Sequence, residues 1–363
     1  MSAPAASVKT DRNGGVAHTS FKQTLQRLAE GGDLSRAQAA WALGQIVDGA
    51  AGEAEAAAFL MGLRVKGETA DEIAGLLETM RSLAVPVETI YRDALVDIVG
   101  TGGDGLGTFN ISTTAAFVVA GAGVRVAKHG NRAASSRCGS ADVMEALGVR
   151  IDLRPAAVAE CLDRVGIGFM LASLHHPATG KVSGVRRALG VRTVFNFLGP
   201  LTNPAGVRRQ LLGVSVPEYL DVLAGALARV GCEHALVVSG HGGMDELSVS
   251  GPSTVVEVRK GAVERRYQLE PEDCGVGRHE QAELAGGDPA ENAALIRRIL
   301  AGETGGPREV VLLNAAAALY VAGVVPSVAA GVGRAAESID SGRAAQVLVD
   351  MVSVTNELAP DRR

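Results

Sequence analysis

Two glycine-rich turns, about thirty residues apart, constrain this chain more than any other feature. The first turn reads DIVGTGGD over residues 97–104, and an apolar helical run begins near Asn110. The second turn reads VAKHGNRAASS over residues 126–136, and a short helical run follows over residues 139–147. In both turns a strand leads into a helix, which directs free backbone N–H groups and the positive end of a helix dipole toward one point. The pair therefore predicts an α/β protein that binds a ligand with more than one phosphate.

The residues of the first turn suit a phosphate. Its three glycines, Gly100, Gly102 and Gly103, permit positive φ and let a phosphate oxygen approach the backbone closely. Asn110 is predicted to cap the following helix, and the hydroxyl of Ser112 could bind a Mg²⁺ ion held near phosphates. Either turn alone is also compatible with an ordinary strand-to-helix connection, because short motifs give false positives.

The second turn is harder to explain as helix capping, because it contains Lys128, Asn131 and Arg132. Neither turn is a Walker A loop, since no Gly-Lys-Ser or Gly-Lys-Thr sequence follows at the required spacing. Neither is a clean Gly-x-Gly-x-x-Gly dinucleotide turn. The two turns together favour a phosphate-rich ligand of another kind.

Composition excludes several classes of function. The chain has 363 residues, 47% of them hydrophobic, and a net charge of −5, so no basic surplus attracts nucleic acid or an anionic membrane. The four cysteines are isolated along the sequence, which favours buried, reduced thiols and a cytoplasmic location. Residues 1–19 are small and polar, and we expect a disordered tail rather than a signal peptide. No apolar run is long and clean enough to span a bilayer.

Hydrophobic periodicity predicts a helical N-terminal part followed by an α/β part. The predicted helices of the first part are 21–29, 36–49, 53–65 and 70–83, with capping boxes at 35–38 and 69–72. Strands are predicted at 96–99, 124–127, 210–215, 235–239 and 254–258, and further helices at 291–302, 310–322 and 334–352. Helical segments between the strands imply right-handed crossovers and a mainly parallel sheet.

Several motifs now resemble one family. They are GTGGD (100–104), NIST (110–113), KHGNR (128–132), GSAD (139–142), HPA (176–178), VRRALG (185–190), RTVFN (192–196), LGPLTNP (198–204) and GMDELS (243–248). In this order they resemble the anthranilate phosphoribosyltransferases, which join anthranilate to 5-phosphoribosyl 1-diphosphate (PRPP) in tryptophan biosynthesis. The resemblance extends from about residue 21 to the C-terminal helix.

The resemblance implies a fold and an assembly. The fold is α/β, with an N-terminal helical domain and a larger α/β domain built on a mainly parallel central sheet, of the nucleoside phosphorylase and phosphoribosyltransferase type. Residues 20–90 would form the helical domain, with 170–195 returning to it, and residues 91–169 and 196–363 would form the PRPP-binding domain. A cytoplasmic homodimer packed through the helical domain is implied, with Mg²⁺ as cofactor, small-molecule substrates, and no nucleic acid or membrane partner.

The resemblance also implies site residues. Those for PRPP are Gly100, Gly103, Asp104, Thr108, Asn110, Ile111, Ser112, Thr113, Lys128, His129, Gly130, Asn131, Arg132, Ala133, Ala134, Ser135, Ser136 and Ser140. Those for anthranilate are Gly100, Asn131, His176 and Arg186, and those for the metal are Ser112, Asp245 and Glu246.

Three of these assignments also have a chemical argument. Asp245 and Glu246 follow strand 235–239, at the edge where parallel sheets bind ligands, although adjacent carboxylates are more often solvated surface charge. An arginine fork binds a carboxylate such as that of anthranilate, but spacing alone cannot distinguish Arg186 from a solvent-facing residue. The histidines are not assigned as general bases.

The sequence departs from the family pattern at residues 171–173, which read Leu-Ala-Ser instead of Phe-Ala-Pro. Loss of the aromatic ring and the proline predicts looser acceptor binding, although neutral drift is an equal alternative. Two other functions remain open, a nucleoside phosphorylase of related architecture and a non-catalytic nucleic-acid-binding relative on the same scaffold.

Overall fold

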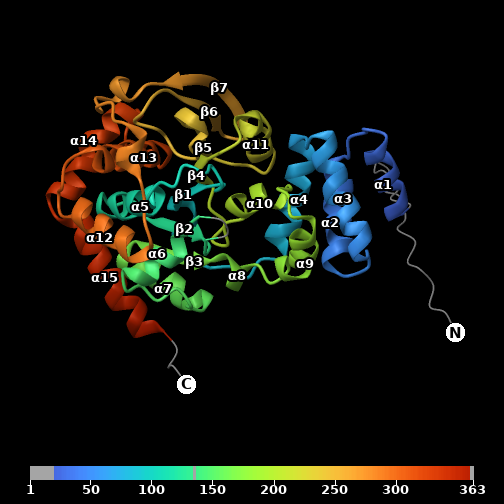
Figure 1. The fold of residues 1–363 in the computed structure, drawn as a ribbon. Helices are drawn as coiled ribbons and strands as arrows, with labels where there is room; N and C mark the ends of the chain where they lie inside the picture. The colour runs from blue at the N-terminus through green and yellow to red at the C-terminus, as the bar shows by residue number, and fades with distance from the viewer. Residues whose placement is uncertain (1–19, 134–135, 360–363) are drawn as a thin grey trace.

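The computed structural model describes residues 20–133 and 136–359, so the predicted disordered tail at 1–19 lies outside the described residues. A bundle of N-terminal helices stands beside a larger α/β body, and three short helices, α8 to α10, lie between them (Figure 1). No helix within the described ranges combines the length and apolar character needed to cross a membrane.

The N-terminal bundle contains α1 (Phe21–Ala29), α2 (Arg36–Val47), α3 (Glu53–Lys66) and α4 (Ala70–Ser82). These helices confirm the four predicted ones, with ends that differ by two residues or fewer. Both predicted capping boxes are present. In the second, the Thr69 hydroxyl accepts from the Glu72 backbone N–H, and the Glu72 carboxylate accepts from the Thr69 N–H at 2.8 Å.

Three helices come from the middle of the chain, and two of them pack against the bundle. They are α8 (Ala172–His175), α9 (Thr179–Leu189) and α10 (Phe195–Leu201). Helix α9 contacts α2 and α3, and α10 contacts α4. The division of the chain into domains at the predicted boundaries stays a prediction.

The central sheet has the order β3-β2-β1-β4-β5-β6-β7. Its strands are β1 (Val96–Gly100), β2 (Val126–Gly130), β3 (Ile167–Leu171), β4 (Arg209–Gly213), β5 (His234–Ser239), β6 (Ser253–Arg259) and β7 (Ala262–Leu269). The five strands β1 to β5 are parallel, and β6 and β7 extend the sheet in antiparallel pairing. The predicted fold class, with its mainly parallel sheet, is confirmed.

Helices cover both faces of this sheet (Figure 1). The remaining helices are α5 (Ile111–Gly121), α6 (Ser140–Ala146), α7 (Pro155–Val165), α11 (Leu220–Arg229), α12 (Pro289–Leu300), α13 (Gly306–Val321), α14 (Val328–Asp340) and α15 (Arg343–Leu358). The single helix predicted at 334–352 is wrong, because the chain breaks at Gly342, whose φ is +78°, and continues as a second helix.

Two strands were not predicted. Strand β3 is buried along its whole length, so it shows no alternation, and it contains a glycine and a methionine. Strand β7 is largely exposed and charged, and it returns from β6 through a tight turn at Lys260 and Gly261, where φ is +48° and +74°. The predicted strand at 124–127 begins two residues later, at Val126, and ends at Gly130.

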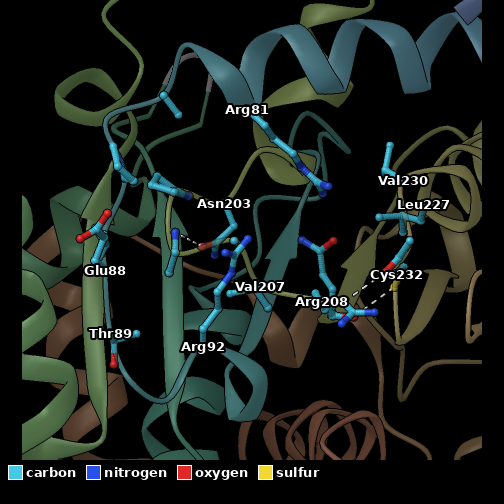
Figure 2. Close-up of a pocket in the computed structure, with 18 residues that line it drawn as sticks. Arg81, Glu88, Thr89, Arg92, Asn203, Val207, Arg208, Leu227, Val230 and Cys232 are labelled. Carbon is cyan, nitrogen blue, oxygen red and sulfur yellow. Dashed lines mark hydrogen bonds between the residues drawn. The ribbon is translucent and has the colours of Figure 1, made fainter.

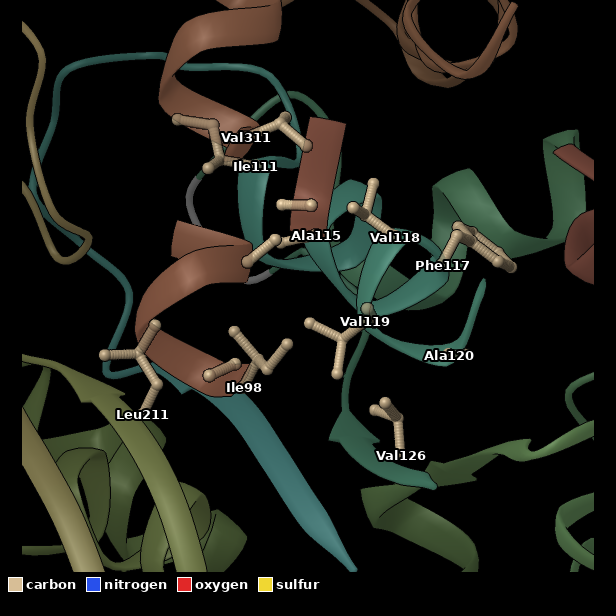
Figure 3. Close-up of a cluster of buried hydrophobic side chains, with 14 of the residues drawn as sticks. Ile98, Ile111, Ala115, Phe117, Val118, Val119, Ala120, Val126, Leu211 and Val311 are labelled. Carbon is tan, nitrogen blue, oxygen red and sulfur yellow. The ribbon is translucent and has the colours of Figure 1, made fainter. Parts of the chain in front are cut away.

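Helix α5 lies at the centre of the main core. Of its residues only Ser112 is not buried. Figure 3 shows its side chains packed between Ile98 and Val126 of the sheet and Val311 of α13. Because packing surrounds the helix, its N-terminal end, which follows the first glycine turn, is fixed in position.

A buried carboxylate fastens the antiparallel extension to the body. Glu257 of β6 is fully buried and accepts hydrogen bonds from Arg259 (2.7 Å), Arg265 (2.8 Å) and the Tyr320 hydroxyl (2.9 Å), with His234 Nε2 at 3.0 Å. Burial would raise the pKa of Glu257, but these donors together hold its pKa well below the usual range. The ionised form is therefore the one that the fold stabilises.

We expect Glu257→Gln to lower the free energy of unfolding at pH 7 by about 1–3 kcal/mol, because the charge-assisted bonds are lost. Exposed Glu264 of β7 is the matched control, and Glu264→Gln should change stability by about 0.5 kcal/mol or less. Since the folded pKa of Glu257 is depressed, its contribution is complete above an unfolded pKa of about 4.3 and is lost as pH falls. Urea unfolding at pH 7 and pH 3.5 measures this, and equal losses in both variants at pH 7 would contradict it.

Candidate active site

A cavity of about 630 Å³ opens at the carboxyl ends of β1 and β2, between the α/β body and helices α4, α8, α9 and α10. Of the predicted PRPP residues, those that line it are Gly100, Gly103, Asp104, Thr108, Asn110, Ser112, Thr113, Lys128, His129, Gly130, Asn131, Arg132, Ala133, Ser136 and Ser140. The predicted residues His176, Arg186, Asp245 and Glu246 line the same cavity. Ile111 does not, since its side chain is fully buried in the core, and Ala134 and Ser135 lie outside the described residues.

The first turn rests directly on the loop that carries Asp245. The Gly102 N–H donates to Asp245 Oδ2 at 2.6 Å. A Cβ at Gly100 would lie 2.2 Å from that carboxylate oxygen, and a Cβ at Gly213 of β4 would lie 1.5 Å from the Asp245 carbonyl oxygen. Only glycine fits at these two strand ends. The absence of a side chain at each lets the loop that carries Asp245 lie in direct contact with the ends of β1 and β4.

Arg192 holds the other side of the first turn, a contact the sequence did not reveal. Its guanidinium donates to the carbonyl oxygens of Gly103 and Gly102, both at 3.0 Å, and to the Ser215 hydroxyl at 3.2 Å. A trans peptide places C=O and the following N–H on opposite sides. Because Arg192 binds the two carbonyls, the N–H groups of Gly103 and Asp104 point away from it.

Three carboxylates meet beside this turn. Asp104, Asp245 and Glu246 each present an oxygen within 4.8 Å of the others. Burial raises the pKa of Asp245 to about 6 and raises that of Glu246 well above its usual range, and the neighbouring negative charges add to both shifts. Buried oxygens of Asp104 and Glu246 have no hydrogen-bond partner among the described residues. Hard oxygen ligands with unused lone pairs fit a divalent cation such as Mg²⁺.

Ser112 is hydrogen-bonded to Lys128 rather than to the three carboxylates. Its hydroxyl is 3.3 Å from the ammonium of Lys128, which also donates to the Ile98 carbonyl at 2.7 Å. Metal binding by Ser112 stays a prediction. Asp104, which the sequence assigned only to PRPP, is the third candidate metal ligand that the fold brings to Asp245 and Glu246.

Lys128 is buried close to a buried carboxylate, Asp97. Burial lowers the pKa of Lys128 to about 8, while Asp97 and Glu246 act in the opposite direction. Asp97 accepts from Asn203 Nδ2 at 2.7 Å and from the His129 N–H at 3.3 Å, and burial raises its pKa to about 6. At pH 7 the lysine therefore remains predominantly a cation at the cavity wall.

The side chain of Asn110, which was predicted to cap α5, links the two turns by hydrogen bonds. Asn110 occupies the N-cap position of α5, as predicted, but its side chain makes no capping hydrogen bond. Its Nδ2 donates to the Cys138 carbonyl at 3.3 Å, and its Oδ1 accepts from Asn292 at 3.0 Å.

In the second turn Arg132 is exposed and pairs with Glu145 at 2.5 Å. Its charge is already partly balanced within the protein.

Two histidines meet edge to face in the cavity. The ring centroids of His129 and His176 are 5.1 Å apart, and His129 Nδ1 lies 3.1 Å from the Gly199 carbonyl oxygen. Burial lowers the pKa of His129 to about 3 and that of His176 to about 4, and neighbouring histidines add to both shifts. Both rings are therefore neutral at pH 7 and are weak bases.

Arg186 is the unpaired cation on the opposite wall. It lies in the last turn of α9, half-buried, with its guanidinium carbon 5.4 Å from the centroid of the Phe195 ring. Burial lowers its pKa, and no carboxylate pairs with it within the described parts of the chain. Its neighbour Arg187 is exposed and outside the cavity. The fold distinguishes the two arginines where spacing could not.

The departure at 171–173 is only partly at the cavity. Leu171 is buried at the end of β3 and does not line the cavity. The loss of an aromatic wall at this position stays a prediction. Ala172 and Ser173 do line the cavity. The effect of serine in place of proline stays a prediction.

Comparison with known proteins agrees with this geometry. The model of the glycosyl transferase family a/b domain matches residues 92–345, and that of the family's helical bundle domain matches residues 22–84. The anthranilate phosphoribosyltransferase of Anaeromyxobacter dehalogenans strain 2CP-C is 55% identical over 335 residues, which cover 92% of this chain and 98% of that protein.

Solved structures agree as well. The crystal structure of the enzyme of that name from Thermus thermophilus has a TM-score of 0.86 and 46% identity, and the match covers 92% of this chain and 99% of that one. The Saccharomyces cerevisiae enzyme in complex with PRPP and Mg has a TM-score of 0.84 and 30% identity, with 93% and 98% coverage. The chain belongs to the anthranilate phosphoribosyltransferase family.

Proposed function

We propose that the chain transfers 5-phosphoribose from PRPP to the amine of anthranilate, releasing pyrophosphate, in tryptophan biosynthesis. The observation that carries this proposal is one cavity that combines two phosphate turns, a carboxylate trio and an unpaired arginine on the opposite wall. The relatives support this transfer rather than the nucleoside phosphorylase or non-catalytic alternatives. The test follows anthranilate fluorescence, which should decrease when the protein, PRPP and Mg²⁺ are all present. It should stay constant if any one of these three is omitted.

The diphosphate would lie on the first turn and the cations beside it. The N–H groups of Gly103 and Asp104 and the ammonium of Lys128 would face its oxygens. Asp104, Asp245 and Glu246 would hold Mg²⁺ at one position, and Ser112 would bind a metal held near the diphosphate at another. When bound, Mg²⁺ neutralises diphosphate charge and so favours its departure.

The acceptor would enter between α9 and the histidines. Arg186 would bind the anthranilate carboxylate, and His176, Asn131 and Gly100 would line its path. The amine nitrogen then attacks C1 of the ribose as the bond from C1 to pyrophosphate breaks, through a transition state with cationic ribose character, and the proton released from nitrogen passes to solvent or to a phosphate oxygen. Since both histidines are neutral and weakly basic, no general base is assigned, and catalysis would come from positioning and charge neutralisation.

Assembly and location are also part of the proposal. We propose a homodimer formed through the helical domain, where Val65 at the end of α3 is 79% exposed. We propose a cytoplasmic location, since the four cysteines are free thiols. We propose no nucleic acid or membrane partner, because the net charge is −5.

The metal assignment predicts separate effects on activity and stability. The double variant Asp245→Asn/Glu246→Gln should lower turnover roughly a hundredfold or more, or shift the Mg²⁺ midpoint strongly upward. Its thermal midpoint at pH 7 should be unchanged or higher, since the raised pKa values show that the charged forms are disfavoured by folding. Asp221→Asn, at an exposed ion pair, is the control. An unaltered Mg²⁺ titration would remove the assignment.

Arg186→Ala should raise the anthranilate KM about ten- to hundredfold, the range for a lost charge-assisted pair, with little change in the PRPP KM. Arg187→Ala is a matched control on the same helix turn and should leave both KM values unchanged. Steady-state kinetics with each substrate varied in turn measures this. Equal effects of Arg186→Ala on both substrates would indicate a general structural role instead.

Arg192 is proposed as a positioning residue for the first turn. Arg192→Lys keeps the charge but loses the fork that spans two carbonyls, so the PRPP KM should rise about tenfold while the anthranilate KM changes little. Arg187→Lys serves as the control. If Arg192→Lys matched the unmodified protein in PRPP KM, the carbonyl contacts would have no part in binding.

A further inference from the structure

A second cavity, of about 500 Å³, lies at the opposite edge of the sheet from the phosphate turns. Its walls come from segment 84–92 before β1, segment 203–210 at the start of β4, and the turn at 230–232 before β5 (Figure 2). Because these segments precede parallel strands, the cavity lies at their amino ends. None of its residues takes part in the proposed transfer.

Arginines dominate the charge of this cavity. Arg81 extends into it from α4, with Arg92 and Arg208 nearby in the same cavity (Figure 2). Arg81 donates to the Leu201 carbonyl oxygen at 2.9 and 3.2 Å, and neither Arg81 nor Arg92 forms an ion pair within the described ranges. Arg208 reaches Glu233 only at 3.6 Å. The exposed side chain of Glu88 is the single carboxylate among the described lining residues.

The backbone is shaped to admit Arg92. A Cβ at Gly206 would lie 2.6 Å from Arg92 Nη2, so the missing side chain leaves room for the guanidinium. Burial lowers the pKa of Arg81; Cys232 and Glu78 act in the opposite direction, and the charge of Arg92 adds to the lowering. Neither guanidinium forms an ion pair with a carboxylate of the described residues, so an added anion would stabilise both.

An apolar wall completes the cavity. Leu227 is buried in the core with half-buried Val230 packed against it, and Val87 is buried in a separate cluster. A site of this volume, with apolar walls and a few charged groups, is typical of small-molecule binding. A bare inorganic anion would leave the apolar wall in water.

We propose that this cavity is a second ligand site, which takes a small organic carboxylate whose charged group binds Arg92 and Arg81 and whose apolar body packs on Leu227 and Val230. The occupant would contact a segment that also walls the transfer site. Pro200 and Thr202 line the first cavity, whereas Asn203 lines the second and donates to Asp97 at 2.7 Å.

The probe is 4-fluorobenzoate, titrated by ¹⁹F NMR into the Arg186→Ala protein so that binding at the proposed acceptor position is suppressed. We expect saturable binding that weakens about tenfold or more when Arg92→Glu is added. Arg187→Glu in the same background is the matched control, since exposed Arg187 lines neither cavity, and it should leave the affinity unchanged. Ala84→Trp, which fills the second cavity without altering its charge, should also abolish binding.

Hydrogen–deuterium exchange locates the probe independently, and slower exchange is expected in segments 84–92 and 203–208. Absence of saturable binding, or equal affinity in the Arg92→Glu and Arg187→Glu proteins, would overturn the proposal. Since binding is measured without turnover, the result is independent of whether the proposed transfer is correct.

Discussion

At the carboxyl ends of β1 and β4, the backbone of the acidic loop lies directly on the backbone of two strands. The contact exists because Gly100 and Gly213 have no side chains, and an added Cβ at either would overlap Asp245. This close contact also brings the Asp245 carboxylate within hydrogen-bonding distance of the Gly102 N–H and next to the Asp104 carboxylate. One packing constraint thus fixes both the metal ligands and the phosphate turn. A larger distance between the Asp245 loop and the strand ends would displace both together.

This compact arrangement concentrates negative charge where water is excluded. The pKa of Asp245 rises to about 6 because burial disfavours its ionised form, and an added cation relieves that cost. On the other side of the turn, Asp97 stabilises the cationic form of Lys128, which would otherwise lose more of its charge on burial. Burying these charged groups lowers the stability of the fold around the turn. It places the Asp245 carboxylate and the Lys128 ammonium at the same cavity, as expected where a polyanion and a cation are bound.

The sequence predicts the strand–turn–helix order, the capping boxes and the acidic pair because each depends on neighbouring residues. Strand β3 was not predicted because burial on both faces removes the alternation that marks a strand. Its glycine and methionine are also weaker strand formers than the valines of the equally buried β5. Asp104 and Arg192 act through partners distant in sequence, Asp245 for the first and the glycine carbonyls for the second, and no local pattern reports such contacts. The burial of Leu171 in the core is likewise set by tertiary packing that no local pattern reports.

The neutral histidines limit how the reaction can be assisted. With pKa values of about 3 and 4, His129 and His176 neither carry positive charge toward a diphosphate nor accept a proton readily at pH 7. Positive charge from the protein's own side chains at the turn must then come mainly from Lys128 and Arg192, because Arg132 is paired with Glu145 whereas Arg192 bonds only to uncharged backbone carbonyls and a hydroxyl. These two side chains alone do not balance a diphosphate, which is the physical reason that the carboxylate trio and a divalent cation belong to the same site.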